Sequence, residues 1–220
     1  MRRVNDALKR PRAGGGLPDK RRAIIAGAMT LFARDGYTRA SLDAIAAESG
    51  VSSRTIYNHF KDKAQLFEAV IQDSSQRTAD AQLAVIDRHL GKIVDLESDL
   101  VEFGLAWRAV SGGGADAAPH FALVRQILAE HEHIPPPAIE AWMRNGPRRV
   151  REELAARLSR IAQREALDVP DPERAAAHLI LLISGDNLST RAEAPDEKEI
   201  TATVAAAVHT FLYGYRRPGP

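Results

Sequence analysis

Residues 36–67 carry the pattern that most restricts how this chain can fold. They read GYTRASLDAIAAESGVSSRTIYNHFKDKAQLF and combine helix-capping residues, a tight turn and short apolar stripes. Ser41 is suited to cap a first short helix, and Gly50 is suited to end it, because glycine tolerates a left-handed conformation. One apolar stripe on that helix is formed at i, i+3 and i+4 by Leu42, Ile45 and Ala46. The pattern predicts a short helix followed by a tight turn.

A second short helix is predicted from Ser53 to about His59, with Ser52 as its cap. Ile56 and Phe60 lie four residues apart, so we expect both to point into a core. A different face of the same helix is formed by Ser53, Arg54, Tyr57 and Asn58. Two short helices around a tight turn are typical of a helix-turn-helix.

The exposed face of this second helix has the chemistry of a DNA reader. A helix of this width fits the major groove, where an arginine such as Arg54 pairs with guanine and an asparagine such as Asn58 pairs with adenine. Tyr57 and His59 are suited to phosphate contacts, which fix the register without reading the sequence. We therefore expect the segment to bind double-stranded DNA.

The next helix is predicted to start at Asp62, with Gln65 placed to complete a capping box. Lys61 and Lys63 bracket this cap. Cations at a helix N-terminus are locally unfavourable, because the helix dipole is positive there. The arrangement is favourable if this end faces a phosphate, which helix amides and lysines attract together.

The segment resembles the DNA-binding domain of the TetR family of bacterial regulators. The matching motifs are F-x-x-x-G-Y from Phe32 to Tyr37, the run from Ser41 to Ser52, and the run from Thr55 to Phe67. The resemblance covers roughly residues 19–70. A looser resemblance, to the AefR-type C-terminal domain, covers about Phe121 to Arg191.

The resemblance implies a homodimer with an all-α fold of about nine helices, in which a helix-turn-helix domain precedes a helical sensing domain. It also implies a repressor that a small molecule releases from a palindromic DNA operator. The places that contact DNA in the family match Lys20, Arg21, Ser41, Ser52, Thr55, Tyr57, His59 and Lys63. The base-reading positions vary within the family, so Ser53, Arg54 and Asn58 are assigned from helix geometry.

Charge is distributed unevenly along the chain. Residues 1–66 hold 13 Lys+Arg against 6 Asp+Glu, whereas the remainder holds 17 against 23. A basic head on an acidic body is typical of a nucleic-acid binder. We expect a basic arm over residues 1–18, a DNA-binding domain over 19–66 and a sensing and dimerisation domain over 67–220. The arm is either a disordered tail of no consequence or a source of additional phosphate or minor-groove contacts.

The composition also bounds the location and the chemistry. The chain has no cysteine, which excludes disulfide and thiolate chemistry. No apolar run reaches the roughly 18–20 residues that span a bilayer, and no signal-peptide core begins the chain, so we expect a cytoplasmic protein with no membrane partner.

The last two predicted helices, residues 172–191 and 196–215, are the candidates for dimerisation. Each has one apolar face, which suits a four-helix interface across a two-fold axis. The candidate interface residues are Leu179, Leu182, Ile183, Val204, Val208, Phe211 and Leu212. The alternative is that these side chains only complete the core of a single chain.

A ligand pocket is expected among the helices between Leu83 and Ala166, because such pockets combine an apolar wall with a few polar groups. Its candidate residues are Phe103, Trp107, Phe121, Arg125, Trp142 and Met143, with Arg108, His120 and His131 as further polar groups. The inducer would be a partly apolar small molecule. For each residue, the alternative is an ordinary place in the core or on the surface.

Catalytic and metal-binding functions find little support. The chain lacks a nucleophile elbow and a phosphate loop, so we expect neither an enzyme nor a cofactor. His131 and His133 are two apart and do not share a helix face, so we expect no metal. Two alternatives remain: a regulator or activator that works without a ligand and has a filled C-terminal core, and a helical carrier or enzyme that retains the DNA-binding head.

Overall fold

The computed structural model describes residues 17–113, 118–165, 167–184 and 195–215. Within these ranges the chain forms ten α-helices and no β-strand, so the predicted all-α fold is confirmed. The α-helices are α1 (Leu17–Arg39), α2 (Leu42–Glu48), α3 (Ser53–His59), α4 (Lys63–Leu90), α5 (Leu96–Arg108), α6 (Ala118–Ala129), α7 (Pro136–Met143), α8 (Arg149–Ala162), α9 (Pro172–Ser184) and α10 (Glu197–Tyr215). The predicted basic arm lies outside the described residues, apart from Leu17 and Pro18, which begin α1.

The helix-turn-helix forms because each short helix carries its own cap. The hydroxyl of Ser41 accepts a hydrogen bond from the Ala44 N–H at 3.1 Å, and that of Ser52 accepts one from the Thr55 N–H at 3.2 Å. Both caps satisfy amides that the first turn of a helix leaves free. Gly50 has a φ of 65°, as expected for a helix-ending glycine.

The start of α4 is close to the predicted capping box and differs in one bond. Asp62 accepts from the Gln65 N–H at 2.8 Å, but the Gln65 side chain returns to the N–H of Lys61, at 2.7 Å, rather than to that of Asp62. The return bond therefore fixes the residue before the cap, which holds the end of α3 close to the start of α4.

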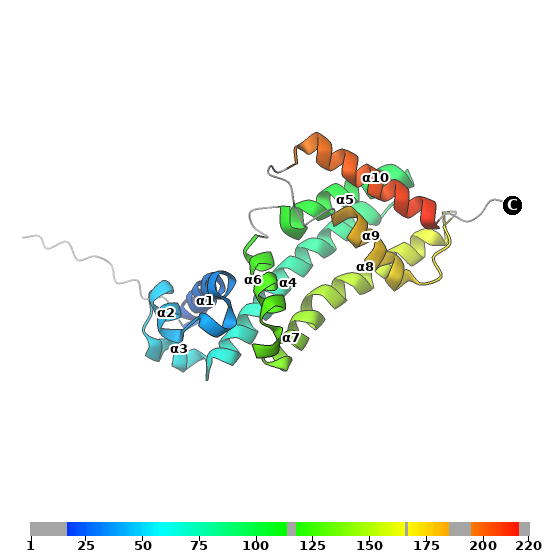
Figure 1. Cartoon of the computed structure of the whole chain (residues 1–220). Helices are drawn as coiled ribbons and strands as arrows, with labels where there is room; N and C mark the ends of the chain where they lie inside the picture. The colour runs from blue at the N-terminus through cyan, green and yellow to red at the C-terminus, as the bar shows by residue number, and fades with distance from the viewer. Residues whose placement is uncertain (1–16, 114–117, 166, 185–194, 216–220) are drawn as a thin grey trace, which may run out of the picture.

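Helix α4 runs from the head, formed by α1–α3 at one end of the molecule, into the body, formed by α5 and α8–α10 (Figure 1). The predicted domain boundary, between residues 66 and 67, falls inside this helix. The hydrophobic cluster of the head includes Leu66 and Phe67 from α4, and it also includes Leu123 and Ile127 from α6. Because α6 packs on α1 and contributes to this cluster, the head shares its core with residues beyond the predicted DNA-binding domain.

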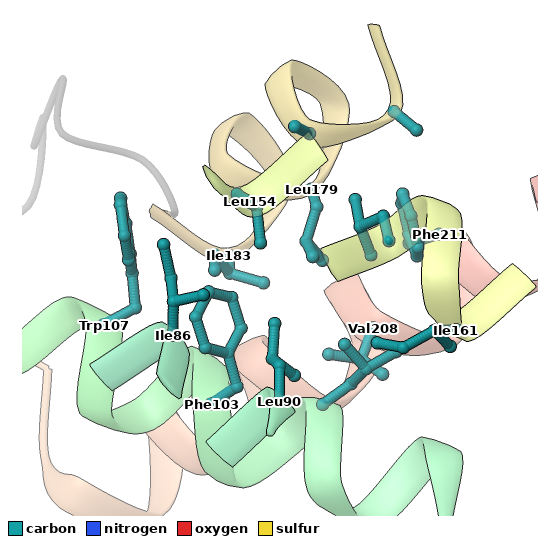
Figure 2. Close-up of a cluster of buried hydrophobic side chains, with 14 of the residues drawn as sticks. Ile86, Leu90, Phe103, Trp107, Leu154, Ile161, Leu179, Ile183, Val208 and Phe211 are labelled. Atoms are coloured by element: carbon teal, nitrogen blue, oxygen red, sulfur yellow. The ribbon is translucent and has the colours of Figure 1, made fainter. Parts of the chain in front are cut away.

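A second hydrophobic cluster fills the body. Its labelled side chains converge from α4, α5, α8, α9 and α10, and Ile86 lies between Trp107 and Phe103 in this view (Figure 2). Helix α5 continues past Arg108 as a π-helical turn, Ala109–Gly113. Arg108 itself donates to the carbonyls of Ile183 and Ser184, which closes the end of α9.

Gly146 and Pro147, a pair that commonly ends a helix, do not break the chain between α7 and α8. A π-helical turn, Arg144–Arg148, carries the chain from α7 directly into α8. A π-turn shifts the hydrogen-bond pattern, which accommodates a proline that has no N–H. Gly146 is buried, and a Cβ there would lie 3.3 Å from the Cβ of Ser75 on α4, so the two helices approach closely.

Candidate nucleic-acid interface

Helix α3 presents one polar face to solvent and buries the opposite one. Ile56 is fully buried and Phe60 is 2% exposed, whereas Tyr57 is 59% exposed. Arg54 and Asn58 are exposed beside Tyr57. The predicted division of α3 into a core face and a free face is therefore present, and three side chains able to touch DNA share the free face.

Two hydrogen bonds between side chains form at the first turn of α3. The hydroxyls of Ser52 and Thr55 lie 2.9 Å apart. The hydroxyl of Ser53 donates to the carboxylate of Asp43 on α2, at 2.6 Å. Asp43 was not predicted from the sequence. It lies ten residues before Ser53, and no local pattern indicates that the turn brings these two side chains together.

Tyr57 and His59 differ in exposure although both were predicted to contact phosphate. Tyr57 is exposed, and its ring is free to approach a DNA backbone. His59 is half-buried, and its Nε2 is buried without a hydrogen-bond partner among the described residues. The His59 ring lies 6.5 Å from that of Phe60. A phosphate contact by His59 would therefore use its other ring nitrogen.

The ammonium of Lys63 lies against the connection between α1 and α2. It donates to the carbonyls of Tyr37, Thr38 and Ala40 at 2.9, 3.2 and 3.1 Å. It also lies 4.7 Å from the centre of the Tyr37 ring. An ammonium has three N–H donors, so these carbonyls occupy all of them. A phosphate contact by Lys63 would require one of these bonds to be exchanged.

The start of α1 brings a second cation to the same side of the head. The guanidinium carbon of Arg21 lies 5.1 Å from the centre of the Phe60 ring, which follows α3 directly. Stacking over a ring leaves the edge of a guanidinium open to other acceptors. Lys20 and Ser41 are exposed at the starts of α1 and α2.

A contact from the end of α6 reaches this head. Glu130, the residue after α6, accepts hydrogen bonds from the N–H and the hydroxyl of Thr38, at 2.8 and 2.9 Å. Gly36, with φ 82° and ψ 175°, makes room for this carboxylate, since a Cβ there would lie 2.1 Å from Glu130 Oε1. Sequence reasoning missed Glu130, because no local pattern distinguishes it from other glutamates at helix ends.

The residues predicted to line a ligand pocket lie in two separate places. Phe103 and Trp107 are buried in the cluster of the body, with ring centroids 5.7 Å apart. Trp142 packs against the cluster of the head, and Arg125 is exposed. Phe121 and Met143 are half-buried. The structure does not bring these six side chains around one common hollow.

His120 is the polar group of this region with the most distinctive surroundings. Its Nδ1 lies 2.8 Å from the hydroxyl of Ser74, which is buried on α4. Burial of the imidazole, aided by the nearby charge of Arg77, lowers the pKa of His120 to about 4. His120 is therefore neutral at physiological pH. His131, by contrast, is exposed in a short 3₁₀ turn with Glu132 and His133.

The predicted dimer residues divide unequally between core and surface. Leu182 is 36% exposed. The other six are buried within the single chain, which corrects their assignment to a partner-facing surface: Leu179, Ile183, Val204, Val208, Phe211 and Leu212. Their periodicity reflects the packing of α9 and α10 on α5 and α8.

The outer surface of α9 and α10 carries a different set of apolar groups. Leu181 is 71% exposed and Tyr213 is 81% exposed. A hollow of about 350 Å³ opens on this surface, and its lining is formed by His178, Leu181, Leu182, Thr210, Phe211, Gly214 and Tyr215. Exposed large apolar side chains gathered around a hollow are typical of a protein–protein contact.

Within the described ranges, no group of three or more potential ligands could hold a metal ion. No helix there combines the length and hydropathy that crossing a membrane requires.

Two family models match the chain. Residues 24–70 match the bacterial regulatory proteins of the TetR family, and residues 116–217 match the C-terminal domain of AefR-like transcriptional repressors. The second match confirms the resemblance expected for the C-terminal domain. The two matches together include α3, the start of α4 and all of α6.

Curated relatives match over part of the chain. The chain is 36% identical over 63 residues to the HTH-type transcriptional repressor Rv1474c of Mycobacterium tuberculosis, covering 29% of this chain and 34% of the relative. It is 29% identical over 142 residues to the HTH-type transcriptional activator FasR of Mycolicibacterium smegmatis, covering 62% and 60%. The chain thus spans less than two thirds of the length of these relatives.

Solved structures match over nearly the whole length. A TetR-family transcriptional regulator from Mesorhizobium loti superimposes with a TM-score of 0.77 at 26% identity, covering 92% of this chain and all of the other. The flavonoid-responsive regulator FrrA superimposes with a TM-score of 0.69 at 23% identity, with the same coverage. With the two family models, these likenesses show that the chain belongs to the TetR family of transcriptional regulators.

Proposed function

We propose that this chain is a homodimeric repressor that binds a palindromic DNA operator through α3 and is released from it by a small, partly apolar molecule. The observation that carries the DNA-binding part is the free face of α3. Arg54, Tyr57 and Asn58 are exposed together while Ile56 anchors the same helix in the core. Such a helix can enter the major groove without losing its support. A DNA-binding regulator of this kind would act in the cytoplasm.

The contact residues divide by role. Arg54 and Asn58 would read base edges, since their side chains match guanine and adenine. Tyr57, Lys20, Arg21 and Ser41 would contact phosphates and fix the register. The remaining predicted positions at the ends of α3 and the start of α4, Ser52, Ser53, Thr55, His59 and Lys63, stay in the proposed interface.

The test is selection of DNA by the purified chain from a random pool at ~150 mM salt, followed by sequencing of the bound fragments. We expect a palindromic motif whose half-sites lie about one helical turn apart, ~34–36 Å. Binding that weakens with salt but selects no motif would exclude a sequence-reading dimer, because phosphate contacts alone produce that behaviour.

The outer surface of α9 and α10 supports the homodimer. Leu181 is exposed and lines the hollow together with Leu182, and Tyr213 is exposed elsewhere on α10, so two copies could bury these groups against each other. Leu181→Glu combined with Tyr213→Glu should convert the dimer into monomers in sedimentation experiments. Leu128→Glu, at a leucine of α6 that is 63% exposed, is the matched control and should leave the dimer intact.

Release by a ligand would act through α6. This helix contacts α4 at the pair His120–Ser74, and its end contacts the head at the pair Glu130–Thr38. A ligand that moves α6 would therefore change both contacts. The ligand can shift the equilibrium between the two positions of α6 only by the difference between its binding free energies for them.

The second candidate function, a regulator that needs no ligand, is favoured by the filled core of the body. Phe103 is fully buried, Trp107 is 3% exposed, and both pack among aliphatic side chains (Figure 2). Activation rather than repression is compatible with this version. Screening partly apolar compounds for quenching of tryptophan fluorescence separates the two candidates. Trp107 on α5 and Trp142 on α7 both lie on helices that pack against α4, so either can report a compound bound beside it. A compound that quenches fluorescence and lowers operator affinity would exclude the ligand-free version.

A further inference from the structure

The hydrogen bond between Ser53 and Asp43 restricts what Ser53 can offer to DNA. Ser53 is the first residue of α3, half-buried at the rim of its free face, and Asp43 is exposed in the first turn of α2. The hydroxyl donates to Asp43 Oδ1 at 2.6 Å. This length is typical of a hydroxyl bound to a charged carboxylate, which is about twice as strong as a bond between neutral groups.

A serine hydroxyl has one proton and two acceptor lone pairs. With the proton held by Asp43, only the lone pairs are free. Phosphate oxygens are acceptors too, so Ser53 in this arrangement cannot bind a phosphate. When it is ionised, the carboxylate of Asp43 can likewise only accept hydrogen bonds. The pair therefore presents acceptors alone toward a DNA groove.

Asp43 is also a carboxylate in a place that would otherwise attract phosphate. The N-terminus of a helix carries positive partial charge, and Asp43 lies in the first turn of α2. Placed near the DNA backbone, a carboxylate would be repelled. Facing base edges in the major groove, it meets amino groups that donate to it.

We propose that Asp43 and Ser53 form an acceptor-only reading pair that selects a base with an exocyclic amino group. In the major groove these bases are adenine, through N6, and cytosine, through N4. Every base pair carries one such amino group in the major groove. The Asp43–Ser53 pair would therefore select which strand carries the amino group and would reject guanine and thymine on the strand that the two residues face. The inference rests on the proposed entry of α3 into the major groove.

The test uses duplexes built on the motif that the wild-type chain selects, with each half-site position changed to all four bases. Binding of the wild type, Ser53→Ala, Asp43→Ala and Glu48→Gln is measured by fluorescence anisotropy at fixed salt. Glu48→Gln removes an equal charge from the other end of α2, away from Ser53. Circular dichroism and thermal melting confirm that each variant is folded.

At one half-site position, the wild type should bind adenine or cytosine about tenfold more tightly than guanine or thymine, as a charge-assisted hydrogen bond allows. Ser53→Ala should lower this preference at that position. Asp43→Ala should lower it to under about threefold, because the freed hydroxyl of Ser53 can then also donate to guanine or thymine. Glu48→Gln should change affinity at every position alike and leave the preference intact.

Two results overturn the inference while leaving the proposed function standing. One is a base preference, at the position that Ser53→Ala affects, that does not follow the strand of the amino group, for example adenine and guanine preferred over cytosine and thymine. The other is an Asp43→Ala variant whose base preferences match those of Glu48→Gln. A wild-type chain that selects no motif overturns the proposed function itself, and the reading pair with it.

Discussion

Glu130 and Thr38 are joined by two hydrogen bonds, from the backbone N–H of Thr38 at 2.8 Å and from its hydroxyl at 2.9 Å. The bonds connect the end of α6 with the residues that lead into α2. From the other side, Lys63 of α4 donates to three carbonyls of the same connection. The approach to the DNA-binding helices is therefore held by both helices that connect the head to the body.

Glu130→Ala should speed the exchange of the Thr38 amide hydrogen in the folded chain. The lost bond joins an N–H to a charged carboxylate and contributes about 1.5 kcal/mol, so exchange through local opening should become about tenfold faster. Hydrogen exchange measured by NMR checks this. Glu132→Ala, two residues further on in the exposed 3₁₀ turn, is the control. Equal exchange at Thr38 in both variants and the wild type would show that the contact is absent in solution.

Gly36→Ala should destabilise the chain more than Gly50→Ala. Gly36 has φ 82° and ψ 175°, a region almost restricted to glycine, and an added Cβ would displace the Glu130 carboxylate from Thr38. Gly50 has φ 65°, and an added Cβ meets nothing within 4 Å. We expect losses of about 2–4 kcal/mol for Gly36→Ala and about 1–2 kcal/mol for Gly50→Ala.

Denaturant unfolding measures both glycine losses. Because the Gly36 overlap involves Glu130, the effect of Gly36→Ala should be smaller in a Glu130→Ala background. Additive effects of the two substitutions would argue against direct contact between these positions.

The fold could be predicted where local chemistry decides it. Ser41, Ser52 and Asp62 cap their helices because a side chain three residues from its partner needs no tertiary information. The apolar stripe of α10 was also predicted from its helical spacing. Periodicity cannot say which neighbour covers a stripe, so residues such as Val204 and Phe211 were assigned to a partner although the same chain buries them.

The candidate site was predicted well on α3 and poorly between distant segments. Arg54 and Asn58 share a free face because helical spacing alone puts them there. The pairs Ser53–Asp43 and Glu130–Thr38 depend on how the turn and α6 fold back, which no spacing reveals. For the same reason, spacing did not reveal that Trp107 and Trp142, both predicted to line a pocket, pack into different clusters.

Lys63→Ala should lower stability as well as DNA affinity. Its ammonium donates to three carbonyls, and bonds to charged groups contribute about 1.5–3 kcal/mol, so we expect a loss in that range. Lys61→Ala removes an equal charge two residues earlier, and its unfolding midpoint should stay near that of the wild type. Thermal melting separates the two lysines, and equal midpoints for both variants would contradict a structural role for Lys63.

Acidification should destabilise the chain through His120. The pKa of this imidazole is about 4 in the folded chain, below its ordinary value of about 6.5, because it is buried. The unfolded chain therefore takes up the proton first, so this contribution to stability is complete above pH ~6.5 and is lost as the pH falls toward 4. Allowing for partial exposure, the loss should reach about 1–2 kcal/mol.

Urea unfolding of the wild type and His120→Gln between pH 7.5 and 4.5 measures this contribution. The variant should show a flatter dependence, whereas His131→Gln, at an exposed histidine, should follow the wild type. Parallel curves for the wild type and His120→Gln would contradict a buried neutral imidazole.

The most direct test of sequence reading by α3 is the affinity ratio between the selected operator and a scrambled duplex of equal length, at ~150 mM salt, for the wild type and Arg54→Ala. Losing a bidentate contact to guanine should lower this ratio by about tenfold or more while the chain stays dimeric. Arg77→Ala, at an exposed arginine of α4 paired with Asp73, should leave the ratio unchanged. An Arg54→Ala variant that keeps the full wild-type ratio would contradict the account.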